Sequence, residues 1–265
     1  MMNLTEMEWL SEKRIVRIAL NNPAKRNALS LALMDNLAEN LREAAESRET
    51  NVVIIRAHGP VFSAGHDLRE ILDQDSGSVR NLFQHCAATM ALIRHMPQIV
   101  LAEVSGIATA AGCQLVAACD LAVAAERARF ATPGVKIGYF CASPSVQVAR
   151  AVPRKKAAEM LFTGDFLDAG EALMYGLVNR VVPDETLSDA TLALAERIAG
   201  WSLPVLSAGK EFLHQQWEMS EDGAAQYAVE FMTRQSTTAD AVEGMTAFFE
   251  KRQPRWSDRP IKTSG

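Results

Sequence analysis

SGIATAAGCQLVAACD, residues 105–120, is the stretch of sequence that decides the fold of this chain. It follows an apolar run at 99–102 and opens with small residues, after which the apolar positions within 115–118 predict a short buried helix. A strand that turns through small residues into a helix presents free backbone N–H groups and the positive end of the helix dipole. We therefore predict a backbone anion site at Ala110–Gly112, with Gly112 opening the helix.

The same arrangement occurs once more, earlier in the chain. The apolar run VVII at 52–55 is typical of a strand covered on both faces, and it leads through HGPVFSAGHD at 58–67 into a helix start at 68–72. Two strand–turn–helix units before the midpoint predict an α/β fold. The polar stretch Asp73–Ser78 is predicted as a mobile loop, followed by a helix from Val79 that ends before Pro97.

The remaining pattern predicts an α/β core over residues 1–200 and a helical region over 201–265. Ser30 is a suitable N-cap for an amphipathic helix that ends near Arg48. Strands are expected at 9–10, 14–20, 121–124, 129–131 and 178–182, the first two as a hairpin, and helices at 145–151, 154–161, 169–175, 188–199, 205–217, 222–235 and 240–251.

Composition excludes several function classes. The 265 residues carry a net charge of −5, which argues against a nucleic-acid-binding surface. No apolar run is long enough for a membrane span, and the first residues do not form a targeting segment. The four cysteines and five histidines show neither disulfide-framework nor metal-site spacing, so we expect no metal and a reducing, cytoplasmic compartment.

The two turns suggest one kind of chemistry. Backbone N–H groups converging from His66 and Ala111 would form an oxyanion hole, which favours negative charge on a carbonyl oxygen. The competing interpretation is structural, because small residues also let strands and helices pack closely. Either interpretation leaves the reaction itself undefined.

Several ordered motifs resemble those of the enoyl-CoA hydratase/isomerase family, whose fold is the crotonase fold. They are FSAGHDL (62–68), ATAAGCQLVAACDLAVA (108–124), FATPGVKIG (130–138), RAVPRKKAAEMLFTGD (150–165), DAGEALMYGLVNRVVP (168–183) and EGMTAFFEKR (243–252). The resemblance implies an α/β spiral of ββα units that binds a fatty acyl- or enoyl-CoA thioester and acts as a lyase or isomerase. It also implies a C-terminal helical region that builds a homotrimer or a dimer of trimers. Coenzyme A would be part of the substrate, with no separate cofactor, and in a eukaryote the compartment would be the mitochondrial matrix.

The resemblance also assigns roles to individual residues. The amides of His66 and Ala111, beside Gly112, would form the oxyanion hole. Lys25, Arg26 and Ala28 would lie along the CoA arm. Ala64, Asp67 and Leu68 would flank the adenine. Phe248 and Lys251 would reach the nucleotide bound by a neighbouring subunit. Tyr139 and Cys141 lie in the stretch that should line the acyl pocket, where the Cys141 thiol is either a nucleophile or a small buried side chain.

The chain departs from the family at two positions. Hydratases of the family use two glutamates, and this chain has Gln114 and Gly134 at those positions. Glutamine cannot take up a proton, and glycine has no side chain, so efficient hydration by the usual route is not expected. Two hypotheses follow: an enzyme that stabilises a thioester enolate or oxyanion, and a non-catalytic acyl-CoA-binding or scaffolding protein. Under the first, Gln114→Glu together with Gly134→Glu should introduce hydration.

Overall fold

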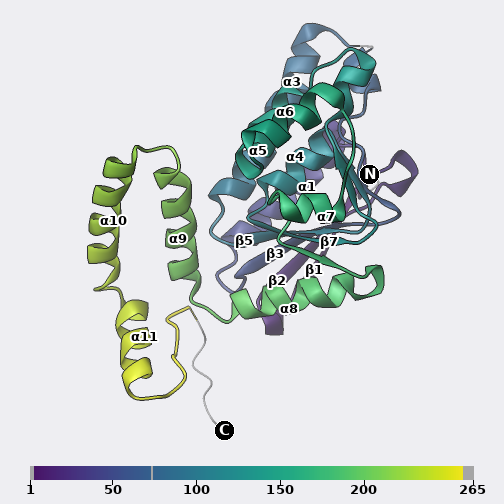
Figure 1. Ribbon diagram of the computed structural model, residues 1–265. Helices are drawn as coiled ribbons and strands as arrows, with labels where there is room; N and C mark the ends of the chain where they lie inside the picture. The colour runs from purple at the N-terminus through teal and green to yellow at the C-terminus, as the bar shows by residue number, and fades with distance from the viewer. Residues whose placement is uncertain (1–2, 73, 259–265) are drawn as a thin grey trace.

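The computed structural model describes residues 3–72 and 74–258 and contains two sheets, the helices that cover them, and a helical arm (Figure 1). The larger sheet has six strands in the order β1-β2-β3-β5-β7-β10. Only β1 runs antiparallel to its neighbour. The strands are β1 (Thr5–Leu10), β2 (Ile15–Leu20), β3 (Val52–Ala57), β5 (Ile99–Val104), β7 (Leu121–Ala125) and β10 (Arg180–Val182).

The smaller sheet has four strands in the order β4-β6-β8-β9. Three of its strands each follow a strand of the larger sheet within a few residues, and helical structure comes next. The strands are β4 (Val61–Ser63), β6 (Ile107–Thr109), β8 (Arg129–Ala131) and β9 (Leu167–Asp168). The chain therefore advances as repeated strand–strand–helix units, which confirms the predicted α/β class and its ββα repeat.

Both faces of the larger sheet are covered, as the apolar run at 52–55 predicts. Val53 and Ile55 belong to the main core with α1 (Leu31–Glu46) and α3 (Ser76–His95), whereas Val52 and Ile54 pack with α8 (Leu187–Ala199) on the other face. All four side chains are buried. This double cover explains why the strand shows no polar alternation.

Side-chain caps fix where α1 and α3 begin. Ser30 caps α1 as predicted, because its Oγ accepts a hydrogen bond from the Leu33 N–H. Asp75 caps α3 by accepting from the N–H groups of Gly77 and Ser78, so this helix begins at Ser76. The prediction of a loop through Ser78 was wrong there because the aspartate supplies a start signal for the polar segment. Asp73, the first residue of that loop, lies outside the described residues.

The other helices differ from prediction mainly at their ends. They are α2 (Arg69–Leu72), α4 (Ala111–Ala118), α5 (Ala142–Ala151), α6 (Arg154–Thr163), α7 (Ala169–Met174), α9 (Leu203–Gln216), α10 (Glu221–Gln235) and α11 (Ala239–Phe249). Sequence patterns missed β4 and β6, which are three residues each, and β9, which is two, and placed only the last two residues of β1 in a strand. Short strands and an edge strand with exposed charges carry too little apolar pattern to predict.

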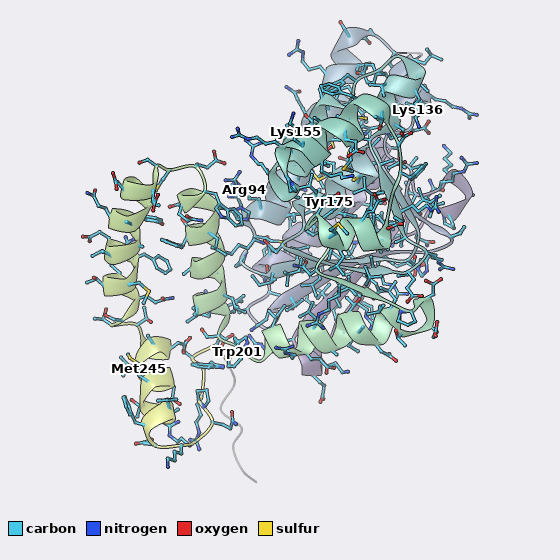
Figure 2. The ribbon with its side chains drawn as sticks, in the orientation of Figure 1. Arg94, Lys136, Lys155, Tyr175, Trp201 and Met245 are labelled. Atoms are coloured by element: carbon cyan, nitrogen blue, oxygen red, sulfur yellow. The ribbon has the colours of Figure 1, made fainter. Side chains whose placement is uncertain are left out.

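Helices α9–α11 form the arm, which extends away from the sheets in Figure 1. Figure 2 places Met245 on the arm, far from Tyr175 on the core. The buried ammonium of Lys210 attaches the arm to the core: its Nζ donates to the carbonyls of Ile93 and Gln98 at 2.7 and 2.9 Å, and to Asp120 Oδ2 at 2.7 Å. One cation thus joins α9 to three points on the core.

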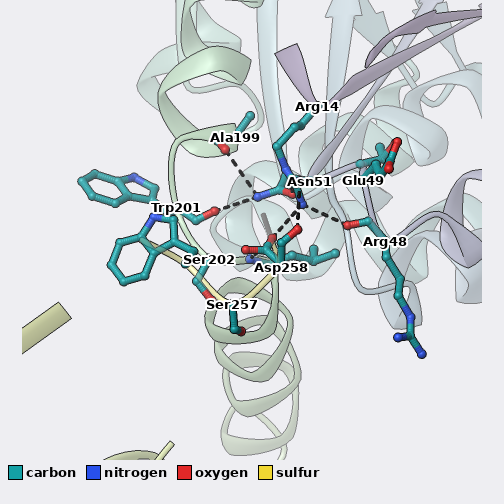
Figure 3. Close-up of polar contacts among 12 residues, drawn as sticks. Arg14, Arg48, Glu49, Asn51, Ala199, Trp201, Ser202, Ser257 and Asp258 are labelled. Carbon is teal, nitrogen blue, oxygen red and sulfur yellow. Dashed lines mark hydrogen bonds and ion pairs between the residues drawn. The ribbon is translucent and has the colours of Figure 1, made fainter. Parts of the chain in front are cut away.

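A second attachment lies where the chain passes from α8 to α9 (Figure 3). Arg14 binds Asn51 Oδ1 at 2.8 Å and Asp258 Oδ2 at 2.7 Å, and Asn51 Nδ2 donates to the Trp201 carbonyl at 2.7 Å. The Leu203 N–H also donates to Asp258 Oδ2. Residues immediately before β2 and β3, the α8–α9 link and Asp258 therefore meet in one polar cluster.

Candidate functional site

The two small-residue turns pack directly against each other. A Cβ on Gly65 would come within 2.8 Å of Ala110 Cβ and 3.1 Å of the Ala111 nitrogen, and a Cβ on Gly112 would overlap the Ser63 carbonyl oxygen. Gly65 also has a φ of +86°, a conformation that L side chains rarely adopt. Glycine is thus required at both positions for the turns to come this close.

The backbone amides of His66 and Ala111, one from each turn, are among the donors left unpaired there. Among the described residues neither N–H donates a hydrogen bond, whereas the Ala110 N–H donates to the Ala131 carbonyl at 2.9 Å. Helix α4 begins at Ala111, so the prediction that Gly112 opens it was wrong by one residue. Ala111 is the first helical residue, and its N–H therefore has no partner within the helix.

Ala110 has an unusual backbone conformation. Its φ of 49° and ψ of −119° suit glycine better than alanine, and such a conformation costs of order 1–3 kcal/mol. The hydrogen bond from its N–H to β8 holds this residue in place. The turn is consequently fixed by the surrounding sheet and not by local preference.

Asn27 holds the first turn from the other side, and sequence reasoning missed it. This buried side chain donates from Nδ2 to the carbonyls of His58 and Val61 at 2.9 and 2.8 Å. Its own carbonyl accepts from the Ser63 hydroxyl at 2.8 Å. No motif marks a buried asparagine in a loop, so only the tertiary contacts identify it as a positioning residue.

The imidazole of His66 is ordered by its neighbours. Nδ1 lies 3.1 Å from the Leu29 carbonyl, which can only accept, so Nδ1 carries the proton in the neutral ring. Nε2 is buried and has no partner among the described residues. The ring meets Phe83 edge-on with centroids 5.2 Å apart, and burial lowers its pKa, so the ring is neutral at neutral pH.

Gln114 lies one helical turn after Ala111 and is only 3% exposed. Its Nε2 donates to Gln147 Oε1 on α5 at 3.0 Å, and its Oε1 accepts from the Cys86 thiol on α3 at 3.8 Å. Sequence reasoning missed both partners. Helical spacing on α3 and α5 identifies which residues face inward but not which polar groups meet.

Gly134 lies in a closed turn of backbone. A Cβ there would overlap the Tyr139 carbonyl oxygen and come within 2.8 Å of Cys141 Sγ. The Tyr139 N–H donates to the Gly134 carbonyl at 2.9 Å, and the Gly134 N–H donates to Cys141 Sγ at 3.3 Å. This segment has no space for a glutamate side chain in its present conformation.

Tyr139 and Cys141 differ in accessibility. Tyr139 is exposed and stacks on Phe83 with centroids 6.5 Å apart, so it joins the aromatic contact that begins at His66. Cys141 is buried, and burial raises the pKa of its thiol. Such a thiol is a poor nucleophile, which favours the packing interpretation of Cys141 over the catalytic one.

The residues expected along the CoA arm and at the adenine lie close together. Lys25 Nζ is 3.7 Å from Asp67 Oδ2, and the Ala64 N–H donates to the Arg26 carbonyl at 3.0 Å. Ala28 lies buried at the end of this loop, while Leu68 is exposed next to Asp67. The structure thus brings these six expected positions to one region beside His66.

Phe248 and Lys251 lie elsewhere. They lie at the end of α11 and just after it, where the Phe248 side chain is 78% exposed. Within one chain they do not join the other expected binding residues. The neighbouring-subunit role that the resemblance assigns to them stays a prediction.

Glu103 on β5 is a buried carboxylate that lies apart from the two turns. It faces α8, on the opposite side of the larger sheet from α4, with Oε1 3.5 Å from Arg56 Nε. Burial raises its pKa, while Arg56 and Arg17 act in the opposite direction.

In the described part of the chain, no group of three or more His, Cys, Asp or Glu side chains is arranged to hold a metal ion.

Comparison with known proteins places this arrangement in a family. The family model for enoyl-CoA hydratase/isomerase matches residues 11–259. The chain belongs to the enoyl-CoA hydratase/isomerase family. It is 49% identical over 245 residues to enoyl-CoA hydratase domain-containing protein 3, mitochondrial, from Danio rerio, covering 92% of this chain and 85% of that protein.

Solved structures of family members share the fold. The crystal structure of human enoyl-CoA hydratase domain-containing protein 3 matches with a TM-score of 0.92, and its sequence is 46% identical. The match covers 96% of this chain and all of that one. An enoyl-CoA hydratase from Mycobacterium smegmatis is 40% identical with the same TM-score, over 96% of this chain and 98% of its own. The expected crotonase fold is therefore confirmed for this member of the enoyl-CoA hydratase/isomerase family.

Proposed function

We propose that this protein binds a fatty acyl- or enoyl-CoA thioester and stabilises negative charge on its carbonyl oxygen through the backbone amides of His66 and Ala111. One observation carries the proposal. The two turns pack within contact distance, and the N–H groups of His66 and Ala111, one from each turn, donate no hydrogen bond to any described residue. Buried or recessed N–H groups are almost always paired, so two adjacent unpaired donors indicate a binding site for an acceptor.

The chemistry proposed for these donors follows from their position and neutrality. Ala111 begins an eight-residue helix, so its N–H adds the positive end of the helix dipole to the hydrogen bond. A thioester oxygen gains negative charge when its α-carbon loses a proton or when a nucleophile attacks its carbonyl carbon. Removal of one such donor elsewhere costs about 10²–10³ in rate.

Lys25 and Arg26 support the assignment of the ligand as a CoA thioester. Both are exposed cations beside the first turn, where they can bind phosphate groups by charge-assisted hydrogen bonds. Asp67, within 3.7 Å of Lys25, holds that side chain near His66. A thioester whose phosphates lie at this loop would have its acyl end directed toward the two amides.

Efficient hydration is not part of the proposal. Gln114 is a neutral amide engaged by Gln147 and Cys86, and Gly134 offers no side chain, so neither position can exchange a proton. Each general acid or base contributes about 10²–10⁴ in rate, and both contributions are missing here. We propose a lyase or isomerase step that depends on charge stabilisation more than on those two positions.

The lack of an acid–base group at Gln114 and Gly134 favours a second candidate function. A non-catalytic protein that binds or sequesters acyl-CoA, or uses it to scaffold other proteins, would keep the two amides and dispense with the carboxylates. The closed backbone at Gly134 supports this candidate because it removes an acid–base position by geometry as well as by composition.

Turnover and binding separate the two candidates. A panel of acyl- and enoyl-CoA thioesters is assayed for product by mass spectrometry and for affinity by calorimetry, with wild type and Gly112→Val. We expect turnover of at least one thioester in wild type and its loss in Gly112→Val, because the new side chain displaces the Ser63 backbone from the turn. Gly209→Ala, at an α9 position with open space, is the control. Binding without turnover across the panel would leave the second candidate, and no binding would contradict both.

We also propose that the arm builds a homotrimer or a dimer of trimers. Met232, Met245, Phe248 and Phe249 are exposed on α10 and α11, and an apolar surface of this kind is typical of an interface. Sedimentation analysis gives the assembly directly. Monomers at micromolar concentration would contradict the proposal.

We also propose that the protein lies in the cytoplasm or, in a eukaryote, in the mitochondrial matrix. All four cysteines are free, which suits the reducing cytoplasm or, in a eukaryote, the mitochondrial matrix. Within the described part of the chain, no helix combines the length and apolar character needed to cross a membrane. Fluorescent tagging in the source cell tests the location.

A further inference from the structure

The polar side chains next to the two amides form a directed chain of hydrogen bonds. The Cys86 thiol on α3 donates to Gln114 Oε1, and Gln114 Nε2 donates to Gln147 Oε1 on α5. Burial raises the pKa of the Cys86 thiol to about 12, so the thiol keeps its proton and acts as the donor. In this arrangement the Gln114 amide oxygen faces Cys86 and the amide nitrogen faces Gln147.

This chain of hydrogen bonds leaves N–H donors unused at its Gln147 end. Both amide oxygens already accept a hydrogen bond, whereas Gln147 Nε2 donates none to any described residue. Gln114 Nε2 has a second N–H beyond the one that Gln147 accepts. Gln147 is half-buried, so its N–H groups remain within reach of a ligand. The pair consequently presents N–H donors where a pair of carboxylates would present acceptors.

The position of these donors is set by the helix. Ala111 and Gln114 are three residues apart on α4 and therefore lie on one face, with Cβ atoms about 5–6 Å apart. An oxygen bound by the Ala111 N–H is thus close to the amide pair. An acyl chain that continues along this face brings its second and third carbons past Gln114 and Gln147.

We propose that the Gln114–Gln147 pair binds an oxygen acceptor carried at the β-carbon of the acyl chain, so that the preferred ligands are 3-oxoacyl thioesters. The inference rests on the proposed binding of a CoA thioester at the two amides. A ketone is favoured over a carboxylate because the pair contacts only neutral groups, and a carboxylate would lose its hydration without gaining a cation. A simple alkyl chain would leave the N–H groups without an acceptor.

Calorimetric titration with three ligands tests the inference: acetoacetyl-CoA, malonyl-CoA and butyryl-CoA. One hydrogen bond to a neutral acceptor corresponds to an affinity difference of about three- to tenfold. We expect acetoacetyl-CoA to bind wild type tighter than butyryl-CoA by that factor, with malonyl-CoA weaker than acetoacetyl-CoA. Equal affinities for acetoacetyl-CoA and butyryl-CoA would overturn the inference while leaving the proposed function intact.

Two variants of Gln147 make the test specific. Gln147→Leu removes the donors and should bring the ratio of the two affinities close to one. Gln147→Glu has the same shape and still accepts from Gln114 Nε2, but it presents a carboxylate to the ligand and should reverse the preference. A ratio that persists in both variants would overturn the role of the pair. Malonyl-CoA as the tightest ligand would overturn the choice of a ketone, and failure of all three to bind would contradict the proposed function as well.

Discussion

Gln114 on α4 and Gly134 in the segment before α5 stand at the two positions where the resemblance predicts glutamates, and they differ from glutamate in different ways. At Gln114 the side chain keeps its length and has become part of a hydrogen-bond chain across three helices. At Gly134 the neighbouring backbone occupies the space that a Cβ would need. The first change is one of chemistry, and the second is one of shape.

This difference decides which change can be reversed. A carboxylate at position 114 fits the existing space and needs only new hydrogen-bond partners. A side chain at position 134 requires the Tyr139 backbone to move. Gln114→Glu combined with Gly134→Glu is therefore expected to disrupt the segment before it can introduce hydration, contrary to the expectation from sequence.

Gly134→Ala should have the largest effect on stability. Its Cβ overlaps a backbone oxygen and crowds Cys141 Sγ, so we expect a loss of more than about 3 kcal/mol in the free energy of unfolding, measured with urea. Gly138→Ala is the matched control in the same segment: it has a φ of +73° but open space, and should cost about 1 kcal/mol. Equal costs for the two variants would show that the segment yields easily at Gly134.

Gln114→Glu should be tolerated, with a loss of about 1–2 kcal/mol at neutral pH because a carboxylate is buried. Gln147 can turn its amide to donate to the new carboxylate. Crotonyl-CoA hydration, followed by loss of enoyl absorbance, should rise at least about tenfold over wild type, since one acid–base group is restored. Gln114→Leu is the control without an acid–base group, and it should show no rise in hydration. Equal rates in both variants would place position 114 away from the reacting carbons.

Cys141→Ala should cost about 1 kcal/mol, because the buried Gly134 N–H loses its sulfur acceptor. Cys141→Ser retains an acceptor and should cost less. Alkylation by iodoacetamide tests the same site: the native thiol should react far more slowly than in the urea-unfolded chain, since burial raises its pKa. Rapid alkylation of the folded protein would favour a nucleophilic role instead.

His66 should give the smallest effect, a dependence of stability on pH. Its pKa in the folded state lies below the ordinary value of 6.5, so the unfolded chain binds the proton more readily. The contribution of the neutral ring to the free energy of unfolding is fully present above pH 6.5, and it is lost as the pH falls toward the folded pKa. Urea unfolding between about pH 7.5 and about pH 5.5 should show a steeper loss for wild type than for His66→Phe. Parallel curves would mean that the ring gains its proton without a penalty.

Much of the fold and part of the site are predictable from sequence. Gly65 and Gly112 indicate the two turns because close approach of backbones demands glycine, and Ser30 indicates a helix start by its side-chain oxygen. The start of α4 at Ala111, the cap at Asp75 and the short strands depend on local geometry that residue type alone does not determine.

The partners of the candidate site are less predictable. Asn27, Cys86 and Gln147 come from a loop and two helices far apart in the chain, and their meeting depends on how α3, α4 and α5 pack. The closure around Gly134 is likewise invisible in the sequence, because it depends on the path of the backbone at Tyr139.

The Lys210 ammonium links events on the arm to the interior of the site. It binds the Ile93 carbonyl in the last turn of α3, and the same helix carries Phe83, which meets His66, and Cys86, which orients Gln114. Under the proposed function, a subunit that binds the arm would therefore act, through Lys210, on the helix that carries Phe83 and Cys86. Assembly and ligand affinity would then be thermodynamically linked, each strengthening or weakening the other by the same factor.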